Sequence, residues 1–392
     1  MARWFFPHHG GGTIRTYQTA KNLVKLGNEV HLLVHHPKSI PHVTLDEEVK
    51  KYEEVEGVHV YRLPYIGPQY LYYSIVIPLM AFYAIRIIMK NKIDVILSHN
   101  PPYLVGMSSW IASKVTGVPM IINVHDAWGS THYGSFESKF GLFLEKFCCK
   151  RVNRIITVNE TLIKTLNSRH GIPMENFEVI PNAVDTERFD VPEEDAEVVR
   201  NNYKIPKNKK IIFFVGNLAN WNGPEHLVRA VPYIKNKDAF VLMVGGGKQE
   251  KELKEISKDY NNIIFTGTVS YHEVPPLMNL ADVCVAPLAK PETVGRALND
   301  FQVPHLLLEY MGCGKPIVGT DVPGIREMLN DNRGFLVKPE NPEDIARGID
   351  YLLEYERLAE EMGKNAREYI KKERSWAKVA KRIEELLKNE LN

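Results

Sequence analysis

The chain has 392 residues and carries 49 lysines and arginines against 48 aspartates and glutamates. This length exceeds the usual size of a single hydrophobic core, so we expect two domains, and the near-neutral charge argues against the broad basic face of nucleic-acid-binding proteins. The four cysteines form no CxxC pair and no regular spacing, which indicates neither a disulfide framework nor a zinc site and fits a reducing cytoplasm.

The amino-terminal segment is short for the first strand of a Rossmann-type unit. Residues 2–6 precede Pro7 and the run Gly10–Gly12, whereas such a strand usually has about five or six apolar residues. We expect no secretory signal peptide here. We also expect the true translation start to lie a few codons upstream of Met1.

Helix-period and strand-period segments then alternate along the first half. A helix is expected from Thr13 to Leu26, ended by Gly27, and a strand from Glu29 to Val34. Further apolar strands are expected at Val58–Leu63, Val95–Ser98, Met120–Val124, Arg154–Val158 and Glu178–Ile180. This alternation predicts a parallel sheet covered by helices on both faces.

The segment 70–89 is the most apolar of the chain and is long enough to span a bilayer of about 30 Å. It contains Pro78 and Arg86 and leads into the next strand in step with the alternation, so we expect a packed helix and not a membrane span. An open alternative is an aromatic-rich face that docks on the membrane interface, with Arg86, Lys90 and Lys92 suited to anionic lipid.

A charged stretch without a long apolar run, from Asp190 to Lys210, separates the first series of elements from a second. The strands expected in the second series are Ile211–Val215, Ala239–Val244, Ile263–Thr266, Val283–Ala286, Pro316–Gly319 and Gly334–Val337. A charged helix is expected from Trp376 to about Leu391. We therefore expect an N-terminal domain over 1–190, a linker over 191–210, a C-terminal domain over 211–375 and a last helix over 376–392.

The stretch from Phe301 to Asp321 predicts an amphipathic helix carrying Glu309, a tight glycine turn and a short strand. Within it, Glu309–Pro316 (EYMGCGKP) resembles the Glu-Ala-Met-Ala-X-Gly-Lys-Pro signature of the retaining glycosyltransferases of family four. The resemblance runs from about Trp4 to the last helix. It implies an α/β GT-B fold, in which two Rossmann-like domains face each other across a deep cleft and the last helix crosses back to the first domain.

The resemblance implies that Glu309 holds the ribose of a nucleotide sugar. A carboxylate suits this task, because its two oxygens can accept hydrogen bonds from two vicinal hydroxyls, and charge-assisted bonds are the stronger kind.

Two glycine runs, Gly10–Gly12 and Gly245–Gly247, follow expected strands, and neither completes the GxGxxG pattern of dinucleotide-binding proteins. Each is either a tight strand-to-helix turn or a place where phosphate or sugar approaches bare backbone amides. The resemblance implies that the first run, with Gly11 and Gly12, faces the donor, and that the strand before it lies near the middle of its sheet.

Two further segments match the family. Val179–Asp185 (VIPNAVD) is interpreted as mainly structural, because its proline and asparagine end a strand and shape a turn. Residues 265–269 resemble the loop whose main chain contacts the base, which implies donor contacts by Thr268 and Val269; an ordinary strand-end turn is the alternative.

His125 follows an expected strand at a position where family members often place a histidine near the donor sugar. Its imidazole could orient a hydroxyl without carrying a fixed charge. The alternative is a strand-end histidine hydrogen-bonded to Asp126.

The sequence departs from the family where the leaving diphosphate is neutralised. The usual arginine and lysine are replaced by Asn217 and Asn222, and the first glutamate of the Glu-x7-Glu pattern is replaced by Phe301. Preorganised positive charge is normally needed at such a site. The candidates to supply it are Arg15, Lys290 and Arg296, helped by the amide end of the helix that starts near Pro304.

These observations predict a transferase that moves a hexosyl or N-acetylhexosaminyl group from a nucleotide diphosphate sugar to a glycan or polyprenol-linked acceptor, with retention implied by the resemblance. We expect it to be cytoplasmic, with a peripheral position on the inner face of the plasma membrane left open, and to have no nucleic-acid partner. The replaced charges keep a second hypothesis open, a catalytically weak or inactive paralogue that binds a nucleotide sugar, a glycan or a partner enzyme.

We expect no metal and no cofactor; the nucleotide sugar is a substrate. The chain has 14 histidines, including the doublets His8-His9 and His35-His36. Adjacent residues on an extended strand point to opposite sides and cannot readily share one metal ion.

Overall fold

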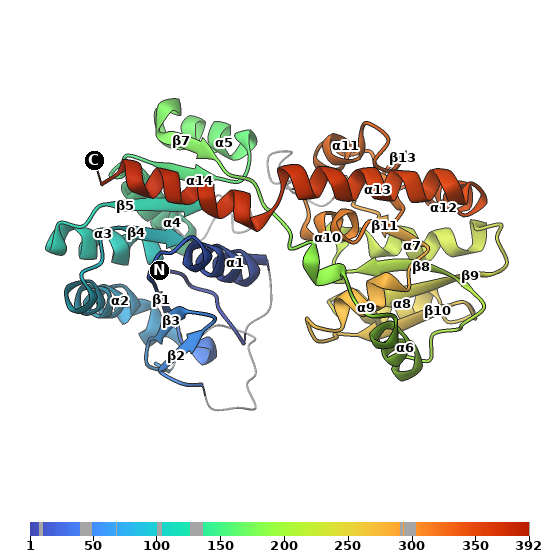
Figure 1. Ribbon diagram of the computed structural model, residues 1–392, viewed down its shortest axis with the longest axis horizontal. Helices are drawn as coiled ribbons and strands as arrows, with labels where there is room; N and C mark the ends of the chain where they lie inside the picture. Colours follow the sequence, from blue (N-terminus) through green and yellow to red (C-terminus); the bar gives the residue numbers. More distant parts are fainter. Residues whose placement is uncertain are drawn as a thin grey trace. The chain divides into compact units, whose positions relative to one another are not determined.

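The computed structural model divides the chain into two compact units, which Figure 1 draws in the colours of the sequence. The first contains Met1–Asn182 together with Trp376–Asn392, and the second contains Ala183–Ser375. The described residues are 1–7, 11–39, 49–67, 69–99, 104–125, 136–290, 293 and 303–391.

The sheet of the first unit is built around the beginning of the chain. Its strands are β1 (Val30–Val34), β2 (Tyr52–Val55), β3 (Val58–Arg62), β4 (Ile96–His99), β5 (Met120–Val124), β6 (Ile155–Thr157) and β7 (Phe177–Val179). β1 pairs with β3, and β4 to β7 pair in chain order, all in parallel. Ala2 N donates to Leu33 O at 3.0 Å, and His99 N donates to Met1 O at 2.8 Å. The strands form two sheets, β1-β3-β2 and β4-β5-β6-β7, and the first extended segment joins them into one layer by bonding to β1 and β4. It therefore lies near the middle of that layer, as the resemblance implied.

Apolar side chains bury both faces of this sheet. The helices of the first unit are α1 (Gly11–Lys25), η1 (Pro37–Ser39), α2 (Gln69–Asn91), α3 (Val105–Thr116), α4 (Phe136–Cys149), α5 (Glu160–His170), η2 (Met174–Asn176) and α14 (Trp376–Asn389). Leu33 of β1 enters a core shared with α2 to α5, whereas Leu32 and Val34 enter a core on the other face. α14 packs against α1, and Asn28 Nδ2 donates to Glu384 Oε1 at 2.8 Å.

The second unit contains a six-stranded, wholly parallel sheet. Its strands are β8 (Lys210–Val215), β9 (Ala239–Val244), β10 (Ile263–Gly267), β11 (Val283–Ala286), β12 (Ile317–Thr320) and β13 (Phe335–Val337), in the order β10-β9-β8-β11-β12-β13. Ile211 and Phe213 of β8 enter one core, and Ile212 and Phe214 enter another. A strand buried on both faces must be apolar throughout, which explains its continuous apolar sequence.

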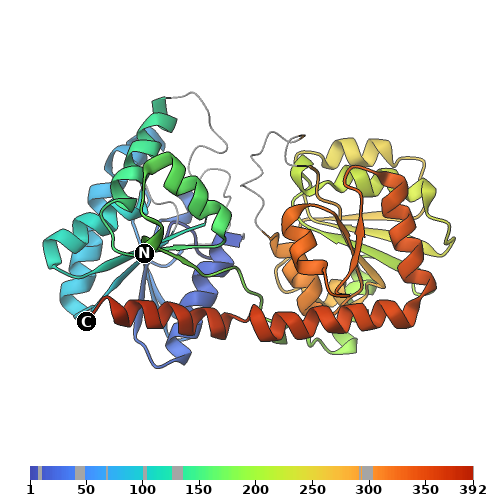
Figure 2. The ribbon, with the colours of Figure 1, turned by 90° about the horizontal axis from the view of Figure 1, so that it is seen from above.

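Helices cover both faces of this second sheet, as Figure 2 shows. They are η3 (Glu187–Phe189), α6 (Glu193–Asn202), η4 (Asn220–Asn222), α7 (Pro224–Ala230), η5 (Val231–Tyr233), α8 (Glu250–Ile256), α9 (Val274–Asn279), α10 (His305–Cys313), α11 (Pro323–Leu329), α12 (Pro342–Glu354) and α13 (Glu356–Glu373). The α/β, GT-B fold class with two Rossmann-like units is confirmed.

Every expected strand is observed, with its ends shifted by at most one residue, but β2 was not expected. It pairs antiparallel with β3 at the edge of the first sheet, so this sheet is not wholly parallel. Its four residues are partly or fully exposed, and such a short edge strand lacks the apolar run that marks a buried one. α1 begins at Gly11, so Gly11 and Gly12 form its first turn and do not precede it.

The charged segment 191–210 is not a free linker between the units. It contains α6, whose Val199 is buried in the core of the second unit, and Ile205 joins the same core. The first unit correspondingly ends at Asn182, before the expected boundary at residue 190. Charge on the exposed face of α6 concealed its apolar contacts in the sequence.

The apolar segment 70–89 lies within α2, as a packed helix. Val76, Met80, Ala84 and Ile88 recur at helical spacing and are buried in the first unit's core. Over the described residues, none of the helices combines the length and the apolarity that crossing a membrane requires.

Candidate functional site

The loops that follow β8, β9 and β10 meet at the carboxyl edge of the second sheet. Gly245 N donates to Gly267 O at 2.9 Å, and Leu218 N donates to Gly246 O at 3.0 Å. A Cβ on Gly245, whose φ is +123°, would lie 2.0 Å from Gly216 O. Only glycine fits such a close backbone approach, so this glycine run acts as a packing turn that gathers the three loops.

The close packing of these glycine loops brings together three of the predicted donor-binding residues, Asn217, Asn222 and Thr268. Asn222 Nδ2 donates to Asn217 O at 2.8 Å. Asn217 Oδ1 would lie 2.6 Å from a Cβ on Gly247, and Thr268 Oγ1 would lie 2.8 Å from a Cβ on Gly246. The two asparagines therefore brace the loop after β8, at positions where the resembled family has cations.

α10 is fixed to the same edge of the sheet. Val215 N, at the end of β8, donates to Tyr310 Oη at 2.9 Å, and Tyr310 is fully buried. Leu306 Cδ2, one turn earlier, would lie 3.7 Å from a Cβ on Gly216. Glu309 lies three residues after Leu306 and next to Tyr310 on this helix, so these contacts fix the segment of α10 that carries it.

An arginine that the sequence analysis did not single out pairs with Glu309. Arg188 Nη1 lies 3.2 Å from Glu309 Oε1. Its Nη2 donates to Tyr271 O, and its Cζ lies 3.3 Å from the centroid of the Tyr271 ring. Arg188 therefore joins α10 to the segment after β10, where Val269 packs partly buried against the core.

The surroundings of Glu309 act on its pKa in two directions. Burial raises the pKa of the carboxyl above its ordinary value, and the charge and hydrogen bond of Arg188 oppose that rise. The side chain is nevertheless 20% exposed. A carboxylate with one cationic partner and an accessible edge can accept further hydrogen bonds from hydroxyl groups.

The loop after β11 lies against the start of α7. A Cβ on Gly223 would lie 1.9 Å from Pro287 O, which requires glycine there. Lys290 N donates to Glu340 Oε1 at 3.0 Å, while the side chain of Lys290 is exposed. Arg296, the other cation predicted in this loop, lies outside the described residues.

In the first unit, polar side chains are buried at the carboxyl ends of β4 and β5. The rings of His125 and His99 lie 5.8 Å apart, edge to face, and these residues are 8% and 5% exposed. Burial, with the Met1 amine and Arg15 nearby, holds the pKa of His99 well below its ordinary value. Asn123 is fully buried, and neither polar atom of its side chain has a hydrogen-bond partner among the described residues. Such buried polar atoms are the kind that a polar ligand satisfies.

Arg15 makes hydrogen bonds within the first unit. It is 1% exposed; Nη1 donates to Asn182 Oδ1 at 2.8 Å, and Nη2 donates to Ile180 O at 2.9 Å. Burial lowers its pKa to about 9. Its guanidinium therefore anchors the matched segment around Asn182, which agrees with the structural interpretation of that segment, and its role as a cation for the diphosphate stays a prediction.

Potential metal ligands do not gather around Glu309 in the described part of the chain. There, one group of at least three such side chains lies close together, formed by Glu29, His31 and His59 in the first unit. The sequence analysis considered only adjacent histidines and missed this group, because its members come from different strands.

Two family models match the chain in succession. The model described as Glycosyltransferase Family 4 matches residues 9–188, and the model described as Glycosyl transferases group 1 matches residues 195–369. Glycosyltransferase MJ1607 of Methanocaldococcus jannaschii is 27% identical over 398 residues, which cover 97% of this chain and 95% of that protein.

Two further likenesses extend over nearly all of the chain. The phosphatidylinositol N-acetylglucosaminyltransferase GPI3 subunit of Saccharomyces cerevisiae is 21% identical over 400 residues, covering 99% of this chain and 82% of that protein. The crystal structure of Anabaena HepE in complex with UDP-glucose superimposes with a TM-score of 0.71 at 19% identity, covering 99% of this chain and 98% of that one. This structural likeness is evidence of the fold.

Replacing Arg15 by methionine should destabilise the first unit by about 3 kcal/mol, because it leaves two buried acceptors without their donor. Calorimetric unfolding measures this loss. Arg382→Ala is the matched control: it removes a half-exposed ion pair with Glu178 and should cost less than about 1 kcal/mol. An Arg15→Met variant with unchanged stability and abolished sugar transfer would instead assign Arg15 to the reaction.

Proposed function

The chain belongs to the group 1 glycosyl transferases of glycosyltransferase family 4, and on this premise we propose that it transfers a hexosyl or N-acetylhexosaminyl group from a nucleotide diphosphate sugar to a glycan or lipid-linked glycan. Configuration at the transferred carbon is retained. The observation that carries the proposal is the Glu309 carboxylate, which pairs with Arg188, keeps part of its surface accessible and lies on the helix that Tyr310 ties to the end of β8.

Glu309 accepts hydrogen bonds from the two ribose hydroxyls of the donor. Arg188 contacts Oε1, and the rigid attachment of α10 through Tyr310 fixes where the carboxylate stands. Thr268 and Val269 lie in the segment that follows β10, and their backbone contacts the base. Support for a nucleotide sugar also comes from Anabaena HepE, whose crystal structure contains UDP-glucose.

The diphosphate is held mainly by dipoles and by cations from the loop after β11. The amide groups of Asn217 and Asn222 and the bare backbone of the glycine loops offer N–H donors. Lys290, whose side chain is exposed, and Arg296 supply positive charge. No metal takes part, and the leaving phosphate accepts the proton of the acceptor hydroxyl, so the protein acts by positioning and by charge stabilisation.

The acceptor side is the first unit. His125, at the end of β5, orients a hydroxyl of the sugar, and the backbone amides of Gly11 and Gly12, in the first turn of α1, contact the donor. A lipid-linked acceptor is supported by the yeast relative, a subunit of a phosphatidylinositol N-acetylglucosaminyltransferase.

The protein is peripheral on the inner face of the plasma membrane, with α2 as the contact. Phe82 and Met89 of α2 are 53% and 72% exposed, although they are large and apolar. Arg86 lies over the Phe82 ring at 5.7 Å, and Lys90 ends the same helix. An apolar face flanked by cations suits an anionic membrane surface.

Titration of the full chain with UDP-, GDP- and ADP-sugars tests the donor site. One nucleotide sugar should bind selectively, and Glu309→Gln should weaken it about 10- to 100-fold, because hydrogen bonds to a charged group are lost. The exposed Glu327→Gln is the matched control and should bind as the unchanged protein does. No binding by folded protein would reject the proposal.

Transfer is then measured with polyprenol-linked and phosphatidylinositol-linked acceptors. A glycolipid product whose anomeric configuration matches the donor supports the proposal. Selective donor binding without transfer to any acceptor in the panel would favour the second hypothesis, an inactive paralogue.

Donor affinity should fall on acidification as Glu309 takes up a proton. Below the pKa, which burial raises above its ordinary value, each pH unit should cost about tenfold in affinity. Arg188→Gln removes the group that opposes the rise, so its loss of affinity should begin at a higher pH. Calorimetric titration across the pH range measures both curves; the exposed Arg326→Gln is the control, and identical curves for the two variants would contradict this assignment.

Replacing both Phe82 and Met89 by serine should reduce flotation with anionic liposomes at least tenfold, because each side chain would otherwise bury apolar surface worth roughly 1.5–3 kcal/mol. The control is Tyr233→Ser, which removes a 51% exposed aromatic side chain from the second unit. Unchanged flotation of the double variant would exclude α2 as the membrane contact.

A further inference from the structure

Two histidines lie side by side on one face of the three-stranded sheet β1-β3-β2 of the first unit. His31 of β1 and His59 of β3 are register partners in the parallel pair, and their rings stack with centroids 4.8 Å apart. Glu29 precedes His31 by two residues, so it projects to the same side of the extended chain. The strand register therefore brings three potential metal ligands together, although Glu29 and His59 are 30 positions apart in the sequence.

Their donor atoms are already close enough for one ion. Glu29 Oε1 lies 2.8 Å from His31 Nε2, and the ligand atoms of the three residues all lie within 4.8 Å of one another. Two ligands of a tetrahedral zinc ion, bound at about 2.0–2.1 Å, are about 3.3 Å apart. Small side-chain rotations therefore suffice to place an ion among them.

Two tyrosines orient the imidazoles for this purpose. Tyr61 Oη lies 3.2 Å from His31 Nδ1, and Tyr52 Oη lies 2.9 Å from His59 Nδ1. In the structure, the Glu29 carboxylate accepts a hydrogen bond from His31 Nε2. When an ion takes the place of that proton, each remaining ring proton lies on Nδ1 and is donated to a tyrosine oxygen, and both Nε2 atoms present a lone pair. Metal-bound histidines almost always make such a bond through their other ring nitrogen.

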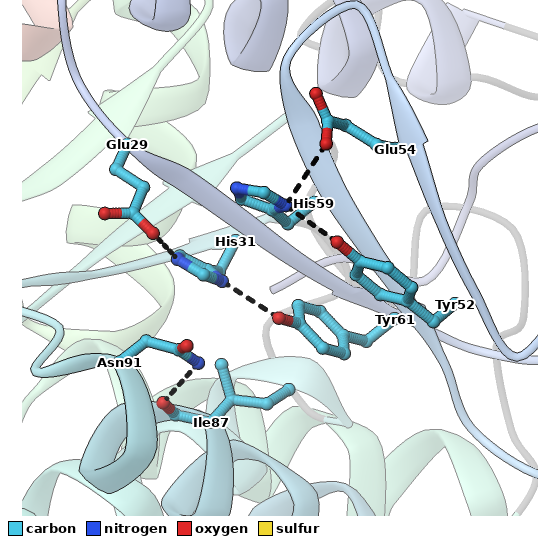
Figure 3. A network of polar contacts seen from close by, with 8 residues as sticks. All are labelled: Glu29, His31, Tyr52, Glu54, His59, Tyr61, Ile87 and Asn91. Atoms are coloured by element: carbon cyan, nitrogen blue, oxygen red, sulfur yellow. Dashed lines mark hydrogen bonds and ion pairs between the residues drawn. The ribbon is translucent and has the colours of Figure 1, made fainter.

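Figure 3 shows the resulting arrangement. The Glu29 carboxylate faces the His31 ring, and the tyrosines stand on the opposite side of the histidines. Among the described residues, Nε2 of His59 has no hydrogen-bond partner, so it gains one when an ion binds.

We propose that Glu29, His31 and His59 form a binding site for a divalent transition metal ion, with zinc as the preferred ion. Two imidazoles and one carboxylate are a common zinc ligand set, and they disfavour magnesium and calcium, which prefer oxygen ligands. Glu29 and His31 also line a cavity of about 430 Å³, through which the ion and a fourth ligand, a water molecule, can enter.

The site is structural and separate from sugar transfer. Glu29 and His31 stand at the amino end of β1, in the three-stranded sheet, whereas His125 stands at the carboxyl end of β5, in the four-stranded sheet. The ion would join β1 to β3, and these strands carry the antiparallel edge strand β2. Binding to the folded state alone raises stability, so the metal would strengthen this edge of the first unit.

The test uses the full chain, stripped with a chelator and then titrated with ZnCl2 by calorimetry and with CoCl2 by visible absorption. We expect one ion per chain, the absorption bands of tetrahedral cobalt, and a higher melting temperature with zinc. His31→Ala and His59→Ala should each weaken zinc binding at least about 100-fold. Tyr61→Phe, which keeps the fold and all three ligands, should weaken it about 10- to 100-fold through the orientation of His31.

Two further variants test whether zinc binds at this site. His272→Ala removes a histidine from the second unit and should leave affinity and stoichiometry unchanged. Glu29→Gln retains shape and hydrogen bonding but removes the anionic ligand, so it should weaken zinc binding while the unliganded protein stays folded. Failure of the unchanged chain to bind zinc, or binding by His31→Ala and His59→Ala as tight as that of the unchanged chain, would overturn the proposal.

Discussion

Parallel strands end at one edge of a sheet, and this constraint organises the second unit. The loops after β8, β9 and β10 emerge side by side, so their backbones meet, and the absence of a side chain at Gly245 lets Gly216 approach. α10 is tied to the same edge by the bond between Val215 and Tyr310. The position of Glu309 therefore follows from backbone packing and from one buried tyrosine.

Charge is distributed differently from the pattern that the resemblance implied. Where cations were expected, the side chain of Asn222 supports the loop by a hydrogen bond to the backbone oxygen of Asn217, and Arg15 anchors the chain at Asn182. The described cation closest to Glu309 is instead Arg188, which also stacks on Tyr271. An ion pair of this kind opposes the rise in pKa that burial causes in the carboxyl group, and it holds the side chain in position.

The strands could be predicted from the sequence for a physical reason. Strands buried on both faces, such as β8 and β9, are continuous apolar runs that no exposed segment resembles. β2 is half exposed and pairs only at the edge, so its sequence carries little signal. α6 was mistaken for a linker because a helix needs few apolar residues to dock, and its exposed charges dominate the composition.

The sequence by itself determined the order and type of most elements and the family, and it singled out Glu309 as a candidate, because these depend on local periodicity and on a contiguous motif. Only the tertiary structure decided which distant side chains contact one another. Arg188 reaches Glu309 across 121 positions, and Arg15 reaches Asn182 across 167. His31 meets His59 only because β1 and β3 pair in that register. Such pairings depend on how distant segments pack, which local periodicity does not encode.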